Sequence, residues 1–120
     1  MLRKLNQCSP ITAGDGTRLR ELLHPDRDYD FTGSYSLAHA VVPVGKTTLK
    51  HRLKVNEVYY ILTGHGMLHI DNQSFKVEPG DAVDIPPGAV QWIENVGLNE
   101  LTFLCIVSPA WRAEDEEILE

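Results

Sequence analysis

Residues 45–64 read GKTTLKHRLKVNEVYYILTG, and this stretch decides the fold of the chain. A glycine stands at each end, and His51 and Glu57 lie between them in sequence that favours β-strands. A second stretch, residues 80–95, reads GDAVDIPPGAVQWIEN. We expect any chemistry of this chain to take place where the two stretches meet.

The rest of the chain has the rhythm of a β protein. From Tyr35 onward, segments of five to eight residues alternate with breaks at Gly, Pro or Asn, and no long helical periodicity appears. This rhythm predicts an all-β sandwich or barrel. Residues 17–23 are predicted to form a further strand. Residues 113–119 are predicted to form a helical tail of about two turns, because acidic residues suit the N-terminal end of a helix.

Alternation of apolar and polar residues predicts which side chains face the core. Between residues 74 and 85, the inward-facing set is Phe75, Val77, Val83 and Ile85. In residues 91–95, one face carries Gln91, Ile93 and Asn95. In the opening stretch, the residues that share one face are His51, Leu53, Glu57, Tyr59 and Ile61. His65 and His69 alternate with core positions and are therefore expected on the outer face.

Two segments, residues 58–62 and 101–107, are almost entirely apolar, which is typical of strands covered on both faces. As neighbours in one sheet they would form an apolar outer patch of Val58, Tyr60, Leu62, Leu104 and Ile106. A monomer rarely leaves such a patch exposed. We expect a second copy of the chain to cover it in a homodimer. The alternative is that the N-terminal segment folds over it.

Composition limits the possible partners. At 120 residues, with 42% hydrophobic and 23% charged residues, the chain is expected to form one globular domain. Its net charge of −6 disfavours nucleic acid and anionic membranes. No apolar run is long enough to span a membrane and no signal peptide is recognisable, so a cytoplasmic location is expected.

The two cysteines and one isolated histidine give weaker signals. Cys8 and Cys105 lie far apart without CxxC spacing, which suggests neither a zinc knuckle nor a disulfide framework. Cys105 is expected to be a buried small hydrophobe, whereas the exposure of Cys8 stays open. His24 precedes a proline in a turn, and we expect a solvated loop residue there.

The two stretches resemble the two motifs of the cupin superfamily, G-x5-H-x-H-x3-E-x6-G and G-x5-P-x-G-x2-H-x3-N. The matching positions are Gly45, His51, Glu57 and Gly64 in the first motif, and Gly80, Pro86, Gly88 and Asn95 in the second. The chain departs from the motifs at Leu53 and Gln91, where the family has histidines. The resemblance covers about half of the chain.

The resemblance implies a cupin-type jelly-roll barrel over residues 1–120. We expect an N-terminal arm in residues 1–32, the jelly-roll core in 33–110 and an acidic tail in 111–120. The pocket of the barrel is expected to be lined by His51, Leu53, Glu57, Tyr59 and Gln91.

The usual cupin metal shell is three histidines and one glutamate around Mn, Fe, Ni, Cu or Zn. By resemblance, this chain offers His51, the Glu57 carboxylate and the Gln91 amide oxygen as ligands. Alternatively, these three side chains hydrogen-bond one another without metal. His39 is a further candidate ligand, although a polar contact or a surface position suits it better.

Two functions remain open from the sequence. The first is a divalent-metal-dependent enzyme acting on a small polar organic molecule such as a sugar or a carboxylic acid derivative. The second is a small-molecule binding module without catalysis. The fold alone does not choose between them, because one fold carries many activities.

Overall fold

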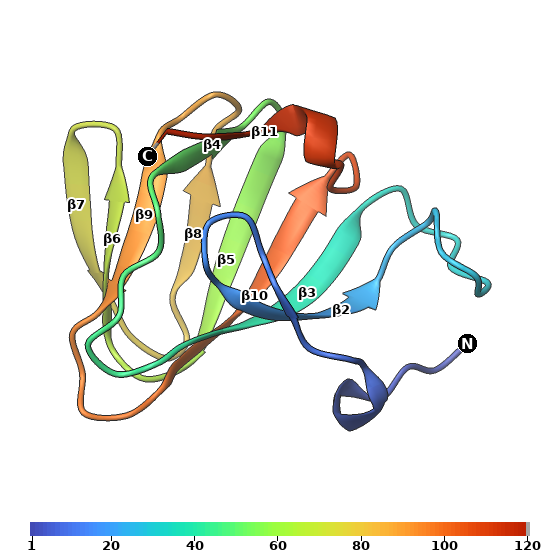
Figure 1. Ribbon diagram of the computed structural model, residues 1–120, viewed down its shortest axis with the longest axis horizontal. Helices are drawn as coiled ribbons and strands as arrows, with labels where there is room; N and C mark the ends of the chain where they lie inside the picture. Colours follow the sequence, from blue (N-terminus) through green and yellow to red (C-terminus); the bar gives the residue numbers. More distant parts are fainter. Residues whose placement is uncertain (120) are drawn as a thin grey trace.

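The computed structural model describes residues 1–119 as two antiparallel β-sheets that face each other (Figure 1). The larger sheet has the strand order β1-β2-β3-β10-β5-β8. Its strands are β1 (Ile11–Thr12), β2 (Arg18–Leu23), β3 (Ser36–Val42), β5 (Asn56–Thr63), β8 (Ala82–Ile85) and β10 (Leu101–Ser108). The smaller sheet, in the order β11-β4-β9-β6-β7, contains β4 (His51–Leu53), β6 (Gly66–Ile70), β7 (Gln73–Val77), β9 (Gln91–Asn95) and β11 (Glu116–Ile118).

This architecture confirms the predicted all-β jelly roll. Consecutive strands β3 and β4 belong to opposite sheets, as do β5 and β6. The strand predicted in residues 17–23 is present as β2. The only helical pieces within residues 1–119 are two 3-10 turns, η1 (Leu5–Gln7) and η2 (Ala113–Asp115). None of the helical segments described is long and apolar enough to cross a membrane.

The core lies between the two sheets and follows the predicted alternation at nearly every position. Phe103 of β10 and Tyr59 of β5 pack at its centre, with their ring centroids 4.5 Å apart. Phe75 is an exception, because 40% of its surface is exposed although its partner on β6, Leu68, is fully buried. The strand that carries Phe75, β7, is the edge of the smaller sheet. The opposite sheet does not cover this edge as it covers the centre.

The predicted helical tail is wrong beyond its first turn. After η2 the chain extends into β11, which pairs antiparallel with β4 so that Glu116 lies opposite Leu53 and Ile118 opposite His51. The acidic residues therefore enter a strand, because pairing with the free edge of β4 outweighs their weak local preference for helix. This pairing brings the tail to the mouth of the barrel.

The N-terminal residues extend the larger sheet and contact the segment before β4. Strands β1 and β2 extend the larger sheet beside β3, and the turn between them crosses toward β4 (Figure 1). There the backbone N–H of Leu49 donates to the carbonyl of Asp15 at 2.8 Å. The arm therefore lies over the mouth of the barrel, on the inner side of the larger sheet.

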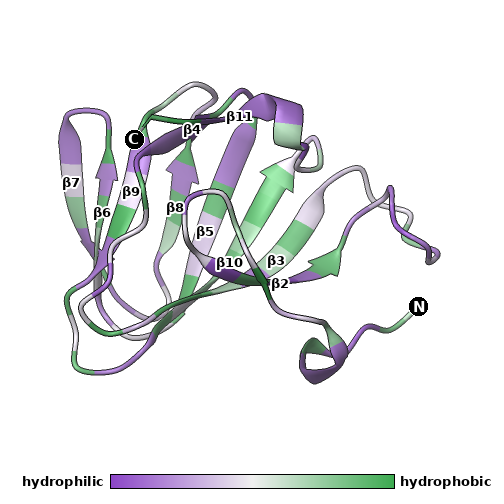
Figure 2. Ribbon diagram, in the orientation of Figure 1, coloured by the Kyte–Doolittle hydropathy of each residue, from purple (hydrophilic) through white to green (hydrophobic). Residues whose placement is uncertain are grey.

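The outer face of the larger sheet remains apolar. Val58 pairs with Ile106 and Tyr60 with Leu104 across β5 and β10, and 41% of the Tyr60 surface is exposed. Figure 2 shows β10 as hydrophobic along most of its length, whereas β4 and β7 are largely hydrophilic. The arm does not run over this patch, so its cover by a second copy remains our expectation.

Candidate functional site

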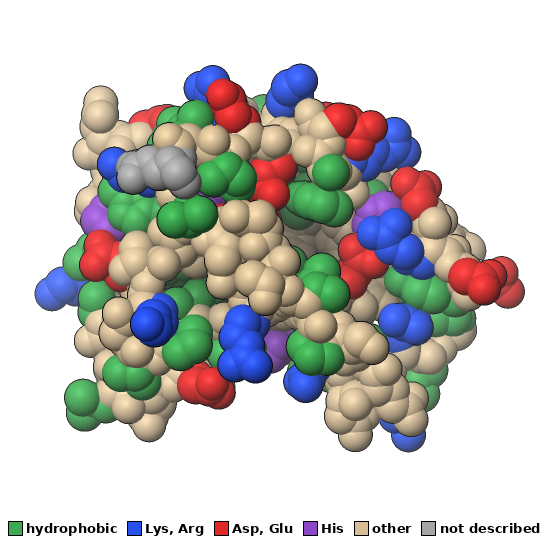
Figure 3. All heavy atoms as spheres, in the orientation of Figure 1, with side chains coloured by type: hydrophobic (Ala, Val, Ile, Leu, Met, Phe, Trp, Pro, Cys, Tyr) green, Lys and Arg blue, Asp and Glu red, His purple; other side chains and the backbone are tan. Residues whose placement is uncertain are grey.

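A cavity of about 590 Å³ opens between the larger sheet, the N-terminal arm and the segment that leads to β11. Figure 3 shows this face hollowed near its middle, with acidic, basic and hydrophobic side chains around the opening. The larger sheet supplies the floor of the cavity in cross-strand rows. One row runs through residues in register on β5, β10, β3 and β2, namely Tyr59, Cys105, Ala38 and Glu21.

Three buried side chains form a hydrogen-bonded trio at one end of the cavity. The Gln91 amide Nε2 donates to Glu57 Oε1 at 2.9 Å, and the Tyr59 hydroxyl donates to Gln91 Oε1 at 3.0 Å. These bonds fix the orientation of the amide. No residue within 1–119 hydrogen-bonds the second oxygen of Glu57, Oε2. Glu57 lines the cavity and can therefore use that oxygen toward a ligand.

Burial decides the charge of Glu57. Burial raises the pKa of this carboxyl to about 8, the Gln91 hydrogen bond opposes the rise, and the negative charges of Asp15 and Glu116 add to it. Glu57 therefore carries a proton at neutral pH. Burial also raises the pKa of Tyr59 well above its usual value, so this phenol stays protonated.

His51 of β4 forms the second polar group of the site, together with Asp15. The His51 Nδ1 lies 2.9 Å from the Leu49 carbonyl, and its Nε2 lies 3.4 Å from Asp15 Oδ2. The other oxygen of Asp15 accepts a hydrogen bond from the Thr17 backbone N–H at 2.9 Å. Both side chains are buried. Because Nδ1 donates to a carbonyl, Nε2 is the nitrogen that faces the carboxylate and the cavity.

Glu116 and Trp111 complete this end of the cavity from the tail. Burial raises the pKa of the half-buried Glu116, the charge of His51 opposes the rise, Asp15 adds to it, and a hydrogen bond from the Trp111 side chain lowers it. Both residues line the cavity. Sequence reasoning missed Asp15 and Glu116. The only signal for Asp15 was its place between two glycines, and Glu116 was expected in a helix.

The predicted pocket residues divide into three groups. His51, Glu57 and Tyr59 line the cavity, and Gln91 stands behind Glu57 and Tyr59, tied to both. His51 and Gln91 are direct partners across β4 and β9. Leu53 is buried on the same face of β4 as His51 but is not among the described residues that line the cavity.

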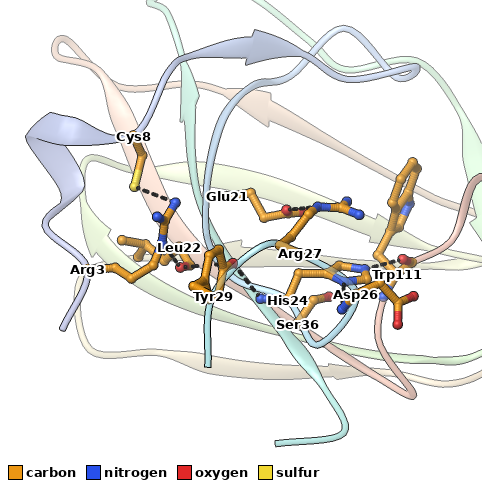
Figure 4. Close-up of polar contacts among 10 residues, drawn as sticks. All are labelled: Arg3, Cys8, Glu21, Leu22, His24, Asp26, Arg27, Tyr29, Ser36 and Trp111. Carbon is orange, nitrogen blue, oxygen red and sulfur yellow. Dashed lines mark hydrogen bonds and ion pairs between the residues drawn. The ribbon is translucent and has the colours of Figure 1, made fainter. Parts of the chain in front are cut away.

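The other histidines do not join the site. The expectation that His24 is a solvated loop residue is wrong, because the side chain is only 1% exposed. Its Nε2 donates to the Trp111 carbonyl at 2.7 Å and its Nδ1 accepts from the Asp26 N–H at 3.1 Å (Figure 4). This hydrogen bond holds the turn that carries His24 against the segment around Trp111. The local sequence does not predict this long-range contact.

His39 lies on the outer face of β3, level with Arg20 and Leu104, and is therefore remote from the cavity. His65 is exposed, and His69 stacks on Trp92 with ring centroids 4.4 Å apart. Both lie on the outer face as predicted.

The donor groups do not fit the metal shell that the cupin resemblance implies. Within residues 1–119, no three side chains of His, Cys, Asp or Glu converge as a metal site would require. The Gln91 oxygen already accepts from Tyr59, Glu57 holds a proton, and Leu53 has no donor atom. Ligation by His51, Glu57 and Gln91 remains a prediction.

The arrangement is suited to proton transfer. A protonated carboxyl, Glu57, and an imidazole–carboxylate pair, His51 and Asp15, border one enclosed cavity. Groups of this kind, held in different protonation states by their surroundings, serve as acid and base on one bound molecule.

Comparisons with known proteins agree with the fold. A family model described as the cupin domain matches residues 38–107. An uncharacterised protein of Methanocaldococcus jannaschii is 44% identical over 117 residues, which make up 96% of this chain and 91% of that protein. An oxalate-binding protein of Thermotoga maritima is 31% identical over 71 residues, 58% of this chain and 59% of that protein.

Among solved structures, a nucleoside dehydratase from Streptomyces aligns with a TM-score of 0.77 and 14% identity, covering 100% of this chain and 91% of that chain. At this identity the likeness shows a shared fold alone.

Proposed function

Because this chain belongs to the cupin family, we propose that it is an enzyme that moves protons on a small polar organic molecule, such as a sugar or a carboxylic acid derivative. The observation that carries the proposal is the placement of Glu57 and the His51–Asp15 pair around one cavity. Buried polar side chains that converge on a cavity are typical of functional sites.

The reaction class that suits these groups is elimination of water or isomerisation. In an elimination, a base takes a proton from a carbon beside a carbonyl, the C–H electrons form a double bond, and the C–O bond breaks. The acid gives its proton to the departing hydroxyl, which leaves as water. Glu57 holds a proton on a carboxyl whose Oε2 is free within the described residues, so it serves as the acid.

The base is the His51–Asp15 pair. The Leu49 carbonyl keeps a proton on Nδ1 of His51, so Nε2 is the atom that exchanges protons, and Asp15 stabilises the imidazolium that forms. Gln91 holds Glu57 in place, and the Tyr59 hydroxyl holds Gln91. The dehydratase with the same fold supports this reaction class as an activity that a cupin barrel accommodates.

A second candidate is a binding module that holds a small acid without converting it. Two observations favour it. The Gln91 amide holds Glu57 Oε1 and the Tyr59 hydroxyl in internal hydrogen bonds, and the relative from Thermotoga maritima is described as an oxalate-binding protein. The two candidates share the cavity and differ in whether protons move.

The test begins with the ligand that the protein carries. Native mass spectrometry of the purified protein should reveal a bound small molecule. That molecule, together with a panel of hydroxy acids, keto acids, aldoses, ketoses and nucleosides, is then incubated with the protein in D₂O and followed by proton NMR. We expect deuterium incorporation or loss of water with the wild type, and a loss of rate of at least about 100-fold in Glu57→Gln and in His51→Gln.

The control variant is Glu114→Gln, which removes an exposed carboxylate from the same chain and should leave the rate unchanged. The rate should also decline above about pH 8, where Glu57 loses its proton. Binding without any exchange or turnover in the wild type would favour the binding module. Turnover that survives both site substitutions would overturn the proposed roles.

A further inference from the structure

The cavity has a second charged end, far from Glu57. Its floor row runs from Tyr59 on β5 through Cys105 and Ala38 to Glu21 on β2. Neighbouring strands lie about 4.8 Å apart, so the two ends of this row are separated by about 14 Å. The side chains between them are small. The floor therefore leaves room for an elongated molecule that lies across the strands.

Arg27 stands at the second end, in an ion pair with Glu21 that uses only part of its hydrogen-bonding capacity. Its Nε donates to Glu21 Oε1 at 2.7 Å and its Nη2 to Glu21 Oε2 at 3.1 Å (Figure 4). This fork uses one edge of the guanidinium and leaves Nη1 without a hydrogen-bond partner among residues 1–119. Both Arg27 and Glu21 line the cavity.

Arg3 brings a second guanidinium to the cavity lining, on the other side of Glu21 from Arg27 (Figure 4). Its Nε donates to the Leu22 carbonyl at 2.9 Å, and its Cζ lies 4.2 Å from the centre of the Tyr29 ring. Its Nη2 lies 3.6 Å from Cys8 Sγ. All of these partners are neutral, and no carboxylate within the described part of the chain pairs with Arg3. The guanidinium is thus held in a fixed position with its charge uncompensated (Figure 4).

We propose that the end of the cavity where Arg3 and Arg27 flank Glu21 binds an oxyanion, a carboxylate or a phosphate, of the same ligand whose reactive end lies beside Glu57 and His51. Guanidinium groups suit this role because their planar donors match the oxygens of carboxylate and phosphate. Trp111 lines the cavity and offers an aromatic surface to the middle of the ligand. The inference rests on the proposed function, since it describes the substrate of that site.

Glu21 sets the strength of this subsite. Its carboxylate occupies the fork of Arg27, so an incoming oxyanion competes with it for the same positive charge. Removal of the Glu21 charge should therefore strengthen oxyanion binding. If Glu21 and Arg27 formed only a structural ion pair, removing the Glu21 charge would not increase the affinity for an oxyanion. A misfolded variant would not show increased affinity either.

The test uses matched probes and a direct measure of binding. The probes are 3-phenylpropionate, its neutral amide 3-phenylpropionamide, phenyl phosphate and inorganic phosphate, titrated into the full chain by calorimetry and by NMR of the Trp111 indole. We expect the wild type to prefer one of the two organic anions over the neutral amide by about tenfold. The preference for carboxylate or phosphate identifies the anion class.

The variants separate the subsite from general effects of charge. Arg3→Gln should abolish the preference for the anion while leaving amide binding unchanged. Glu21→Gln should raise the affinity for the anion by about threefold to tenfold. Lys4→Gln, which removes an exposed positive charge beside Arg3 but outside the cavity lining, is the control and should change nothing.

Three results would overturn the subsite. The first is equal binding, or no binding, of anion and amide by the wild type. The second is an anion preference that survives Arg3→Gln and does not rise in Glu21→Gln. The third is inorganic phosphate binding as tightly as phenyl phosphate, which would contradict an elongated ligand. None of these results touches proton exchange at Glu57, so failure of the subsite is distinguishable from failure of the proposed function.

Discussion

The motif-bearing strands and the two terminal segments contribute differently to this molecule. Residues 45–64 and 80–95 build the barrel and place the trio of Glu57, Gln91 and Tyr59. Residues 1–32 and 111–119 supply the cavity groups that make this barrel chemically distinct, namely Arg3, Asp15, Glu21, Arg27, Trp111 and Glu116. The barrel motif thus provides one part of the site, and terminal segments without a recognisable motif complete it.

The largest expected effect is a gain of metal binding when the motif is restored. His51 and Gln91 lie opposite each other on β4 and β9, and Leu53 shares the face of His51. The double variant Leu53→His, Gln91→His should bind Zn²⁺ or Mn²⁺ at least about 1,000-fold more tightly than the wild type, because each added ligand is worth several kcal/mol.

Competition with a chelating dye measures this gain. Gln73→His adds an exposed histidine on β7 and is the control for non-specific binding. If the double variant binds metal no better than this control, β4 and β9 do not direct these positions into one site. The motif-bearing strands would then not build the site as described.

The next effect tests the arm. Asp15→Asn removes the charge that faces His51 in a buried pair. We expect the free energy of unfolding, measured by urea denaturation, to fall by about 1 to 3 kcal/mol, since the substitution removes the buried carboxylate that faces the imidazole. Asp28→Asn, an exposed change in the same arm, should alter it by less than about 0.5 kcal/mol.

A double-mutant cycle with His51→Gln should show less destabilisation than the sum of the two single changes, because each change removes the same buried contact. Full additivity of the two changes would show that Asp15 and His51 are independent of each other.

A smaller effect concerns the outer face, which the arm leaves uncovered. Leu104 lies opposite His39 on the neighbouring strand. Two buried nitrogen atoms, His39 Nδ1 and Arg20 Nε, have no hydrogen-bond partner among the described residues. If a second copy covers this face, Leu104→Gln should raise the dissociation constant of the dimer by about 20-fold, because apolar burial is lost.

Analytical ultracentrifugation measures this change. Leu98→Gln, in a loop where the side chain is 93% exposed, is the control. A wild-type protein that is monomeric at micromolar concentration would rule out the dimer.

The smallest effect, when expressed per pH unit, is a slope in the pH dependence of stability. The folded protein keeps the proton of Glu57 up to about pH 8, whereas the unfolded chain releases it near the ordinary value of 4.5. Between these values the folded state binds more protons, so stability falls as pH rises, by up to about 1.4 kcal/mol per pH unit.

Glu57→Gln should flatten this slope in urea denaturation measured from pH 5 to pH 8. Glu100→Gln, an exposed change, should keep it. A wild-type protein whose stability rises over this window would contradict a proton-bearing Glu57.

Local sequence patterns predicted the barrel well because strand alternation and turn residues act over a few positions. They placed Gln91, Ile93 and Asn95 on one buried face and His65 and His69 on the other side of the sheet. These patterns gave wrong predictions where a contact with a residue far away in the sequence determines the local structure. The tail of residues 116–118 becomes a strand because it pairs with the free edge of β4, and the buried His24 donates a hydrogen bond to the distant Trp111 carbonyl. No local pattern encodes either contact.

Long-range contacts that the local sequence does not predict also decide the expected metal site. The sequence identified Leu53 and Gln91 as departures, but it did not reveal that the Gln91 oxygen is held by Tyr59. Nor did it reveal that Asp15, from a turn between two glycines, comes to face the imidazole of His51.

The positions of the two tryptophans give the protein a built-in optical reporter. Trp111 lines the cavity, whereas Trp92 stacks on His69 at the outer face of β9. A ligand that enters the cavity should alter the fluorescence of Trp111 and leave that of Trp92 as an internal reference. With Trp92→Phe, the emission of a single indole would follow occupancy of the site in real time, before any substrate is known to turn over.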